Sequence, residues 1–108
     1  MEKKVEDKIQ ELQMIEQNLQ NFLAQKQAFH SQLMETETAL SEIQNSEKAY
    51  KIIGNIMVLS SKDGLQKELG SKKEIVELRI KTLERQETRL RDSASELQKE
   101  VLEELNRK

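Results

Sequence analysis

The sequence is poor in the residue types on which compact, secreted or catalytic domains depend. It has no cysteine, so disulfides, thiolate metal sites and thiol nucleophiles are excluded. It also lacks proline and tryptophan, and aromatic residues make up only 3% of its 108 residues. Charged residues, by contrast, make up 35%. This composition is typical of long helices and not of a packed globular core.

Sites for catalysis, cofactors or metals are equally scarce. The only histidine, His30, excludes any site that needs two histidines from one chain. The three glycines lack the spacing of a phosphate-binding loop. Glutamates are numerous, but they follow charged helical faces with no apolar pocket around them. We therefore expect a protein that is not an enzyme and holds neither a cofactor nor a metal ion.

Long apolar runs and a strong charge of one sign are missing as well. The longest apolar run in the central segment, Ile56–Leu59, is far shorter than the roughly 20 residues that span a bilayer. The first residues lack the apolar core of a signal peptide. A net charge of −2 gives no general attraction to nucleic acid or anionic lipid. We expect a soluble cytoplasmic protein that binds neither nucleic acid nor membranes.

The apolar segment Ala49–Ser61 lies between two charged arms and predicts a β-hairpin. Gly54 and Asn55 divide it into two strands, and glycine at the first turn position suits a type II′ turn, which needs positive φ there. This turn predicts the register. The expected pairs are Ile53 with Ile56, Ile52 with Met57, Lys51 with Val58, and Tyr50 with Leu59.

Both faces of this hairpin would be apolar. Tyr50, Ile52, Met57 and Leu59 share one face, and the opposite face is mostly apolar too. An isolated two-stranded hairpin is marginally stable in water and has two unpaired edges. We therefore predict that the hairpin joins copies of the chain. The predicted oligomerisation residues are Tyr50, Ile52, Ile53, Gly54, Ile56, Met57, Val58 and Leu59.

The first arm, about residues 3–47, has the periodicity of a coiled-coil helix. Alternating steps of three and four residues from Val5 reach twelve positions, of which nine are apolar. These positions are Val5, Lys8, Leu12, Ile15, Leu19, Phe22, Lys26, Phe29, Leu33, Thr36, Leu40 and Ile43.

The second arm, about residues 63–107, shows the same pattern, with eight of ten positions apolar. These positions are Leu69, Lys73, Val76, Ile80, Leu83, Glu87, Leu90, Ala94, Leu97 and Val101. Asp63, followed by Gln66, is a candidate N-cap, and Gly70 is a candidate bend. Since the arms are nearly equal in length, we predict a mainly α-helical single domain over residues 1–108. In it an antiparallel two-helix coiled coil is joined by the hairpin at about residues 49–61.

Charged residues interrupt both seams. If the hairpin pairing continues along the arms, partners have residue numbers that sum to about 110. Lys26 then lies near Glu84 and Glu87, and Lys73 near Glu37. These charges either fix the register of the coiled coil or extend out of it into water. The other basic residues of the second arm alternate with glutamates, a pattern of salt bridges within one helix.

Both ends of the chain are unusually apolar. The candidate residues there for binding other proteins are Val5, Ile9, Leu12, Leu97, Val101, Leu102 and Leu105. Ile9 and Leu102 lie off the seam positions, so the ends have more apolar surface than one seam covers. This surface either binds apolar segments of other proteins or remains an unused widening of the seam.

The sequence resembles the beta-type subunits of prefoldin, a chaperone. The resemblance is carried by Tyr50-Lys51-x-x-Gly54-Asn55-Ile56-x-Val58 in the hairpin and by Leu83-Glu84-Arg85-Gln86-Glu87-x-Arg89-Leu90 in the second arm. One hairpin, not two, indicates the beta type over the alpha type.

The resemblance implies a hetero-hexamer of two alpha-type and four beta-type subunits. Their hairpins would close into a β-barrel platform, and their free tips would grip unfolded proteins without ATP and pass them to a group II chaperonin. The alternative is a structural coiled-coil scaffold without client binding.

Overall fold

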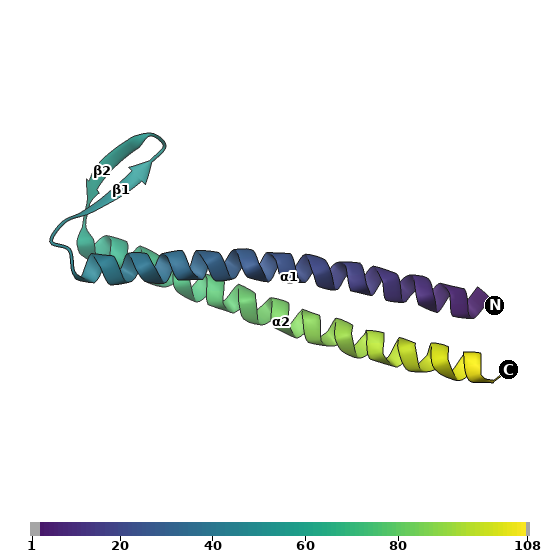
Figure 1. The fold of residues 1–108 in the computed structure, drawn as a ribbon. Helices are drawn as coiled ribbons and strands as arrows, with labels where there is room; N and C mark the ends of the chain where they lie inside the picture. The colour runs from purple at the N-terminus through teal and green to yellow at the C-terminus, as the bar shows by residue number, and fades with distance from the viewer. Residues whose placement is uncertain (1–2, 108) are drawn as a thin grey trace. The chain divides into compact units, whose positions relative to one another are not determined.

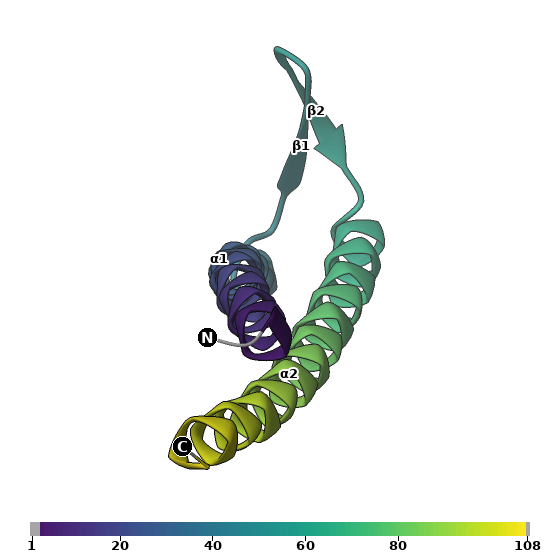
Figure 2. The same cartoon turned by 90° about the vertical axis from the view of Figure 1, so that its right-hand side faces the viewer.

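The structure, a computed structural model, describes residues 3–107. The elements follow in the order α1 (Lys3–Gln44), β1 (Ala49–Ile53), β2 (Ile56–Ser60) and α2 (Lys62–Asn106), and the two strands form one antiparallel sheet (Figure 1, Figure 2). The predicted fold class, two long helices joined by one β-hairpin, is confirmed.

The chain divides into two compact units. The terminal unit contains the residues up to Gln27 and those from Lys81 onward, so it pairs the first part of α1 with the last part of α2. The hairpin unit is Ala28–Ile80, with the rest of both helices and the sheet. None of the helices in the described range is long and apolar enough to cross a membrane.

The helices are antiparallel within each unit. In the terminal unit Lys8 contacts Glu104 and Lys26 contacts Glu87. Higher residue numbers in α1 therefore face lower residue numbers in α2. In the hairpin unit Lys73 of α2 contacts Glu37 of α1.

The predicted seams form the core of both units. Every predicted seam position in α1 and α2 is buried or half-buried. The most buried apolar residues include Val5, Ile15, Val76, Ile80, Leu83 and Val101. The alternation of three and four residues therefore identified the buried side of each helix, because it keeps one stripe facing the partner helix.

Both helices differ from expectation where they meet the hairpin. α1 ends at Gln44 and not near residue 47, because side chains beyond it satisfy its last carbonyls. The Ser46 hydroxyl donates to the Glu42 carbonyl at 2.8 Å, and the Asn45 amide donates to the Ser41 carbonyl at 3.4 Å.

The expected N-cap of α2 was wrong. Ser61 and not Asp63 caps the helix, since the Ser61 hydroxyl accepts a hydrogen bond from the Gly64 backbone N–H at 3.2 Å. Asp63 lies in the first helical turn, where a carboxylate is favoured by the helix dipole. Helix α2 continues through Gly70.

Candidate assembly and binding surfaces

The hairpin has the predicted register. Tyr50 pairs with Leu59, Lys51 with Val58, Ile52 with Met57, and Ile53 with Ile56. Gly54 has a φ of 60°, and no non-glycine residue in the described range has positive φ. Positive φ at the first turn position alone is the requirement of a type II′ turn, whereas type I′ needs it at both.

One face of the hairpin is entirely apolar and uncovered. Tyr50 is 54% exposed, Ile52 68%, Met57 64% and Leu59 61%. Exposed apolar side chains gathered on one face are typical of an interaction site and not of an ordinary protein surface.

The opposite face of the hairpin is tied to the helices. The Lys51 ammonium lies 2.9 Å from the Glu68 carboxylate of α2, and Ala49, on the same face, is buried. Lys62 also donates to the carbonyl of Gln44, which joins the end of α1 to the start of α2. These contacts position the hairpin while leaving the Tyr50 face free. Ile53, Ile56 and Val58 complete the predicted oligomerisation set, and all three are exposed.

The candidate client-binding residues differ in exposure within the terminal unit. Val5 and Val101 are buried in the seam, whereas Leu102 and Leu105 are 59% and 43% exposed. The half-buried members are Ile9, Leu12 and Leu97. Met14 adds an exposed apolar side chain outside the predicted set. The two leucines are therefore accessible from solvent, whereas the two valines are covered by the packing of the helices.

Lys8, also in the terminal unit, contacts two carboxylates of α2. Its ammonium lies 3.2 Å from a carboxylate oxygen of Glu100 and 3.2 Å from one of Glu104. A hydrogen bond to Glu104, and to a smaller extent one to Glu100, raises the pKa of Lys8 above its usual value. The rule that partner numbers sum to about 110 would have found both glutamates.

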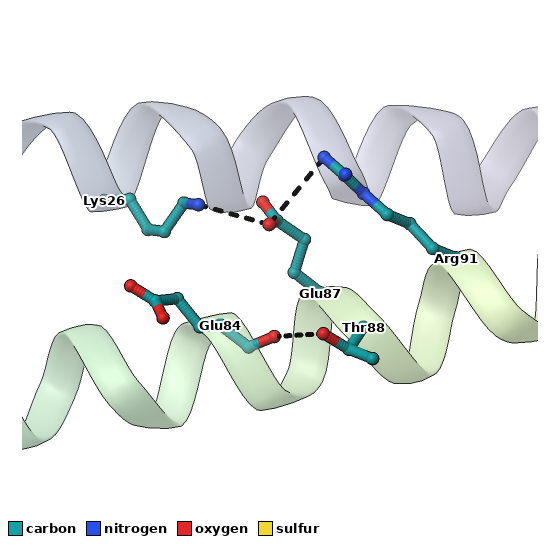
Figure 3. Close-up of polar contacts among 5 residues, drawn as sticks. All are labelled: Lys26, Glu84, Glu87, Thr88 and Arg91. Carbon is teal, nitrogen blue, oxygen red and sulfur yellow. Dashed lines mark hydrogen bonds and ion pairs between the residues drawn. The ribbon is translucent and has the colours of Figure 1, made fainter.

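The predicted contact between Lys26 and Glu87 is confirmed. The Lys26 Nζ atom lies 3.1 Å from Glu87 Oε1, and Arg91 approaches the same oxygen at 3.7 Å (Figure 3). Glu84, the other predicted neighbour, forms no ion pair with Lys26 in the described part of the chain, and its backbone carbonyl accepts a hydrogen bond from the Thr88 hydroxyl. The side chains of Lys26 and Glu87 are only 18% and 11% exposed, so they meet within the seam and do not extend into water.

Salt bridges within α2 are fewer than the charge pattern predicted. Lys73 reaches Glu77 at 4.0 Å and Arg91 reaches Glu87, but Lys73 also crosses to Glu37 at 3.8 Å. The Arg79 guanidinium lies 5.8 Å from the centre of the Phe29 ring on α1. Several charges of α2 thus contact α1 and not only their own helix.

No cluster that could hold a metal ion occurs within residues 3–107. His30 is an exposed residue of α1. The largest exposed apolar side chains of the two units include those of the hairpin face and Leu102 and Leu105 of the terminal unit.

These features define a class of protein: a coiled-coil subunit whose connecting hairpin presents an uncovered apolar face. The family model for prefoldin subunits matches residues 6–108, and the chain belongs to the prefoldin family.

Known proteins similar to the chain are archaeal beta subunits. Prefoldin subunit beta of Archaeoglobus fulgidus is 40% identical, over 90% of this chain and 86% of its own length. Prefoldin subunit beta of Pyrobaculum islandicum is 37% identical, over 95% of this chain and 85% of its own length. The crystal structure of the prefoldin beta subunit from Thermococcus strain KS-1 superposes with a TM-score of 0.89 at 33% identity, covering 96% of this chain and 94% of that one.

Family membership settles the broad function. Prefoldin is a non-enzymatic chaperone family, so the chain has a chaperone role and acts within a prefoldin complex. The predicted beta type agrees with the relatives in both sequence and structure.

Proposed function

We propose that the chain is the beta-type subunit of an ATP-independent holdase. In this proposal it works in the cytoplasm, captures non-native proteins at apolar residues of its terminal unit, and delivers them to a group II chaperonin. The observation that carries the proposal is the presence of uncovered apolar side chains in both units: the Tyr50 face in one, and Leu102 and Leu105 in the other.

The hairpin face serves assembly in this proposal, with an alpha-type subunit and further beta-type copies as partners. Burying one large apolar side chain completely stabilises a complex by about 1.5–3 kcal/mol. Each subunit offers four such side chains on this face, all of them more than half exposed. Their burial favours association, whereas leaving them in water would favour aggregation.

The terminal unit serves client binding. Leu102 and Leu105 are exposed and offer immediate contacts, and the half-buried Ile9, Leu12 and Leu97 belong to the same predicted set. Val5 and Val101 support this surface from inside the seam. A few exposed leucines bind weakly, but several subunits that hold one client together gain avidity through effective concentration.

The test separates assembly from client binding. Ile52→Glu with Met57→Glu should lower the native mass, measured alone and with an alpha-type subunit. Leu102→Gln with Leu105→Gln should leave the mass unchanged but weaken suppression of a denatured client's aggregation. Leu23→Gln is the matched control, since Leu23 is an exposed apolar residue of the terminal unit outside the predicted set.

Three outcomes would contradict parts of the proposal. If the wild-type complex leaves aggregation unchanged at stoichiometric amounts, the holdase role fails and the scaffold alternative gains. If the Leu102→Gln and Leu105→Gln variant suppresses aggregation as well as the wild type does, clients bind at another surface. If a labelled client bound to the complex never transfers to an added group II chaperonin, the delivery step fails.

A further inference from the structure

Lys8 is held between two carboxylates from successive turns of α2. Its Nζ atom lies 3.2 Å from Glu100 Oε2 and 3.2 Å from Glu104 Oε1. Its side chain is only 17% exposed, so the aliphatic part is covered while the ammonium joins the two helices. All three residues belong to the terminal unit.

Glu104 depends on this contact. Its side chain is 20% exposed, and its Oε2 atom is buried with no hydrogen-bond partner among the described residues. A carboxylate that has lost most of its water is costly once its cation is removed. Without the Lys8 charge, the simplest relief is for the helices to separate there and let water reach Glu104.

The residues next to these charges are the buried members of the candidate client-binding set. Val5 precedes Lys8 by one helical turn, and Val101 lies between Glu100 and Glu104 in the sequence. Both valines are buried, at 4% and 8% exposure. Separation of the helices at this level would expose them in addition to the already exposed Leu102 and Leu105.

We infer that Lys8, Glu100 and Glu104 form an ionic latch that controls how much apolar surface the terminal unit presents. When the latch is closed, Val5 and Val101 stay within the seam. When it opens, they join Leu102 and Leu105, and an apolar client stabilises the open state because it binds that state better. This inference rests on the proposed client binding by the terminal unit.

Two features make such a latch easy to open. Partly exposed ion pairs contribute little net stability, and they weaken as salt rises. Helix ends also open locally at lower cost than helix centres. The latch is therefore suited to respond to client binding or ionic strength without unfolding the chain.

Amide hydrogen exchange on the full chain in its native assembly tests the latch. Glu100→Gln with Glu104→Gln should speed exchange near Val101 by about two- to fivefold, the effect of losing weak ion pairs. The matched control is Glu96→Gln with Glu103→Gln, which removes equal charge from exposed residues of α2. Neither of these glutamates has a salt bridge within the described part of the chain.

Two further measurements identify the cause. Lys8→Glu should speed exchange, and adding Glu104→Lys should restore much of the protection, because one opposite-charge contact returns. Raising the salt concentration should bring the exchange rate of the wild type near Val101 closer to that of the Glu100→Gln and Glu104→Gln variant. Equal exchange in the latch and control variants, or no recovery in the charge-swapped pair, would overturn the latch.

Client holding then tests its consequence. The Glu100→Gln and Glu104→Gln variant should suppress client aggregation at a lower subunit concentration than the control variant. Faster exchange with unchanged client holding would overturn the regulatory role. Failure of the wild-type complex to hold any client contradicts the proposed function instead, and the exchange experiment still decides whether the latch exists.

Discussion

Lys26 of α1 and Glu87 of α2 meet inside the seam of the terminal unit, with 3.1 Å between Lys26 Nζ and Glu87 Oε1. The second oxygen of Glu87 is buried without a hydrogen-bond partner in the described part of the chain. Each of the two residues occupies a position that an apolar side chain takes elsewhere in the seam. The pair therefore makes the alignment of the helices depend on charge, although an apolar pair could fill the same space.

Removing one partner of this pair should be costly. Lys26→Met leaves the Glu87 carboxylate, 11% exposed, with only Arg91 at 3.7 Å as a cation. We expect the free energy of unfolding to fall by about 1–3 kcal/mol, the cost of an unsatisfied and partly buried charged group. Urea unfolding measures this loss of stability. The subunit concentration is held fixed, because assembly adds a concentration-dependent stability of its own.

Replacing both partners is the matched control. Lys26→Leu with Glu87→Leu should be as stable as the wild type or more so, since no charged side chain remains at these two seam positions. The charge pair then specifies alignment and does not supply stability. If Lys26→Met has the same unfolding midpoint as the wild type, the pair is already solvated in solution and the prediction is wrong.

The parts of the structure that could be predicted depend on local and repeated patterns. The stripe of apolar residues predicted both buried seams because a coiled coil repeats its contacts every three to four residues. Gly54 predicted the hairpin register, because a two-residue turn leaves one way to pair the strands. The contact between Lys26 and Glu87 followed by extending that register along the arms.

The parts that could not be predicted depend on competition between neighbouring groups. Ser61 takes the capping role expected of Asp63, because α2 begins directly after β2. Similarly, Ile9 and Leu102 both lie off the seam positions, and the sequence did not reveal that Ile9 is half-buried while Leu102 is exposed. Which side of a helix faces its partner near a terminus depends on packing, and composition does not contain it.

Thr36 offers a test of the seam in the hairpin unit. It is 3% exposed, and its hydroxyl donates to the Gln32 carbonyl at 2.8 Å. That carbonyl also accepts the regular helical hydrogen bond, so Thr36→Val removes a buried hydroxyl without leaving an acceptor unpaired. We expect unfolding stability to be unchanged or to rise by about 1 kcal/mol at most. Thr36→Ser keeps the hydroxyl but loses the methyl group, and should be less stable by about 1 kcal/mol.

Lys8 should give the terminal unit a characteristic dependence on alkaline pH. Its pKa is raised above 10.5 in the folded chain, so folding favours the protonated form. The stability that it contributes is fully present below pH 10.5 and is lost as the pH rises through the higher folded pKa. The facing charges are Glu100 and Glu104 of α2, with Lys4 and Glu11 one turn away on α1.

The measurement compares Lys8→Met with the wild type at each pH. The difference in unfolding stability should be constant from neutral pH to about pH 10 and then shrink. Comparing the two proteins at each pH removes the effects of pH that they share. Lys4→Met is the control, because Lys4 is exposed and has no salt bridge within residues 3–107. A difference that persists unchanged above pH 11 would contradict the pKa direction.

Replacing Gly54 or Gly70 with alanine should change the stability of the chain in opposite directions. A Cβ atom added at either residue would meet no atom of the more distant parts of the chain within 4 Å, so only the local backbone conformation decides the effect. Gly54 has a φ of 60°, where an L-residue is strained, and Gly54→Ala should cost about 1–2 kcal/mol. Gly70 lies inside α2, where alanine is the better helix former, and Gly70→Ala should stabilise by about 0.5–1 kcal/mol.

Thermal unfolding of both variants at one subunit concentration checks these signs, with Gly54→Asn as a milder change at the turn. Asparagine tolerates positive φ better than alanine, so Gly54→Asn should fall between the wild type and Gly54→Ala. The turn at Gly54 aligns Ile52 with Met57, so strain introduced by Gly54→Ala should also weaken assembly through the Tyr50 face. The native mass of this variant should then fall on dilution. Gly70→Ala should leave the native mass unchanged. If Gly54→Ala is as stable as the wild type and assembles normally, the hairpin does not need a type II′ turn.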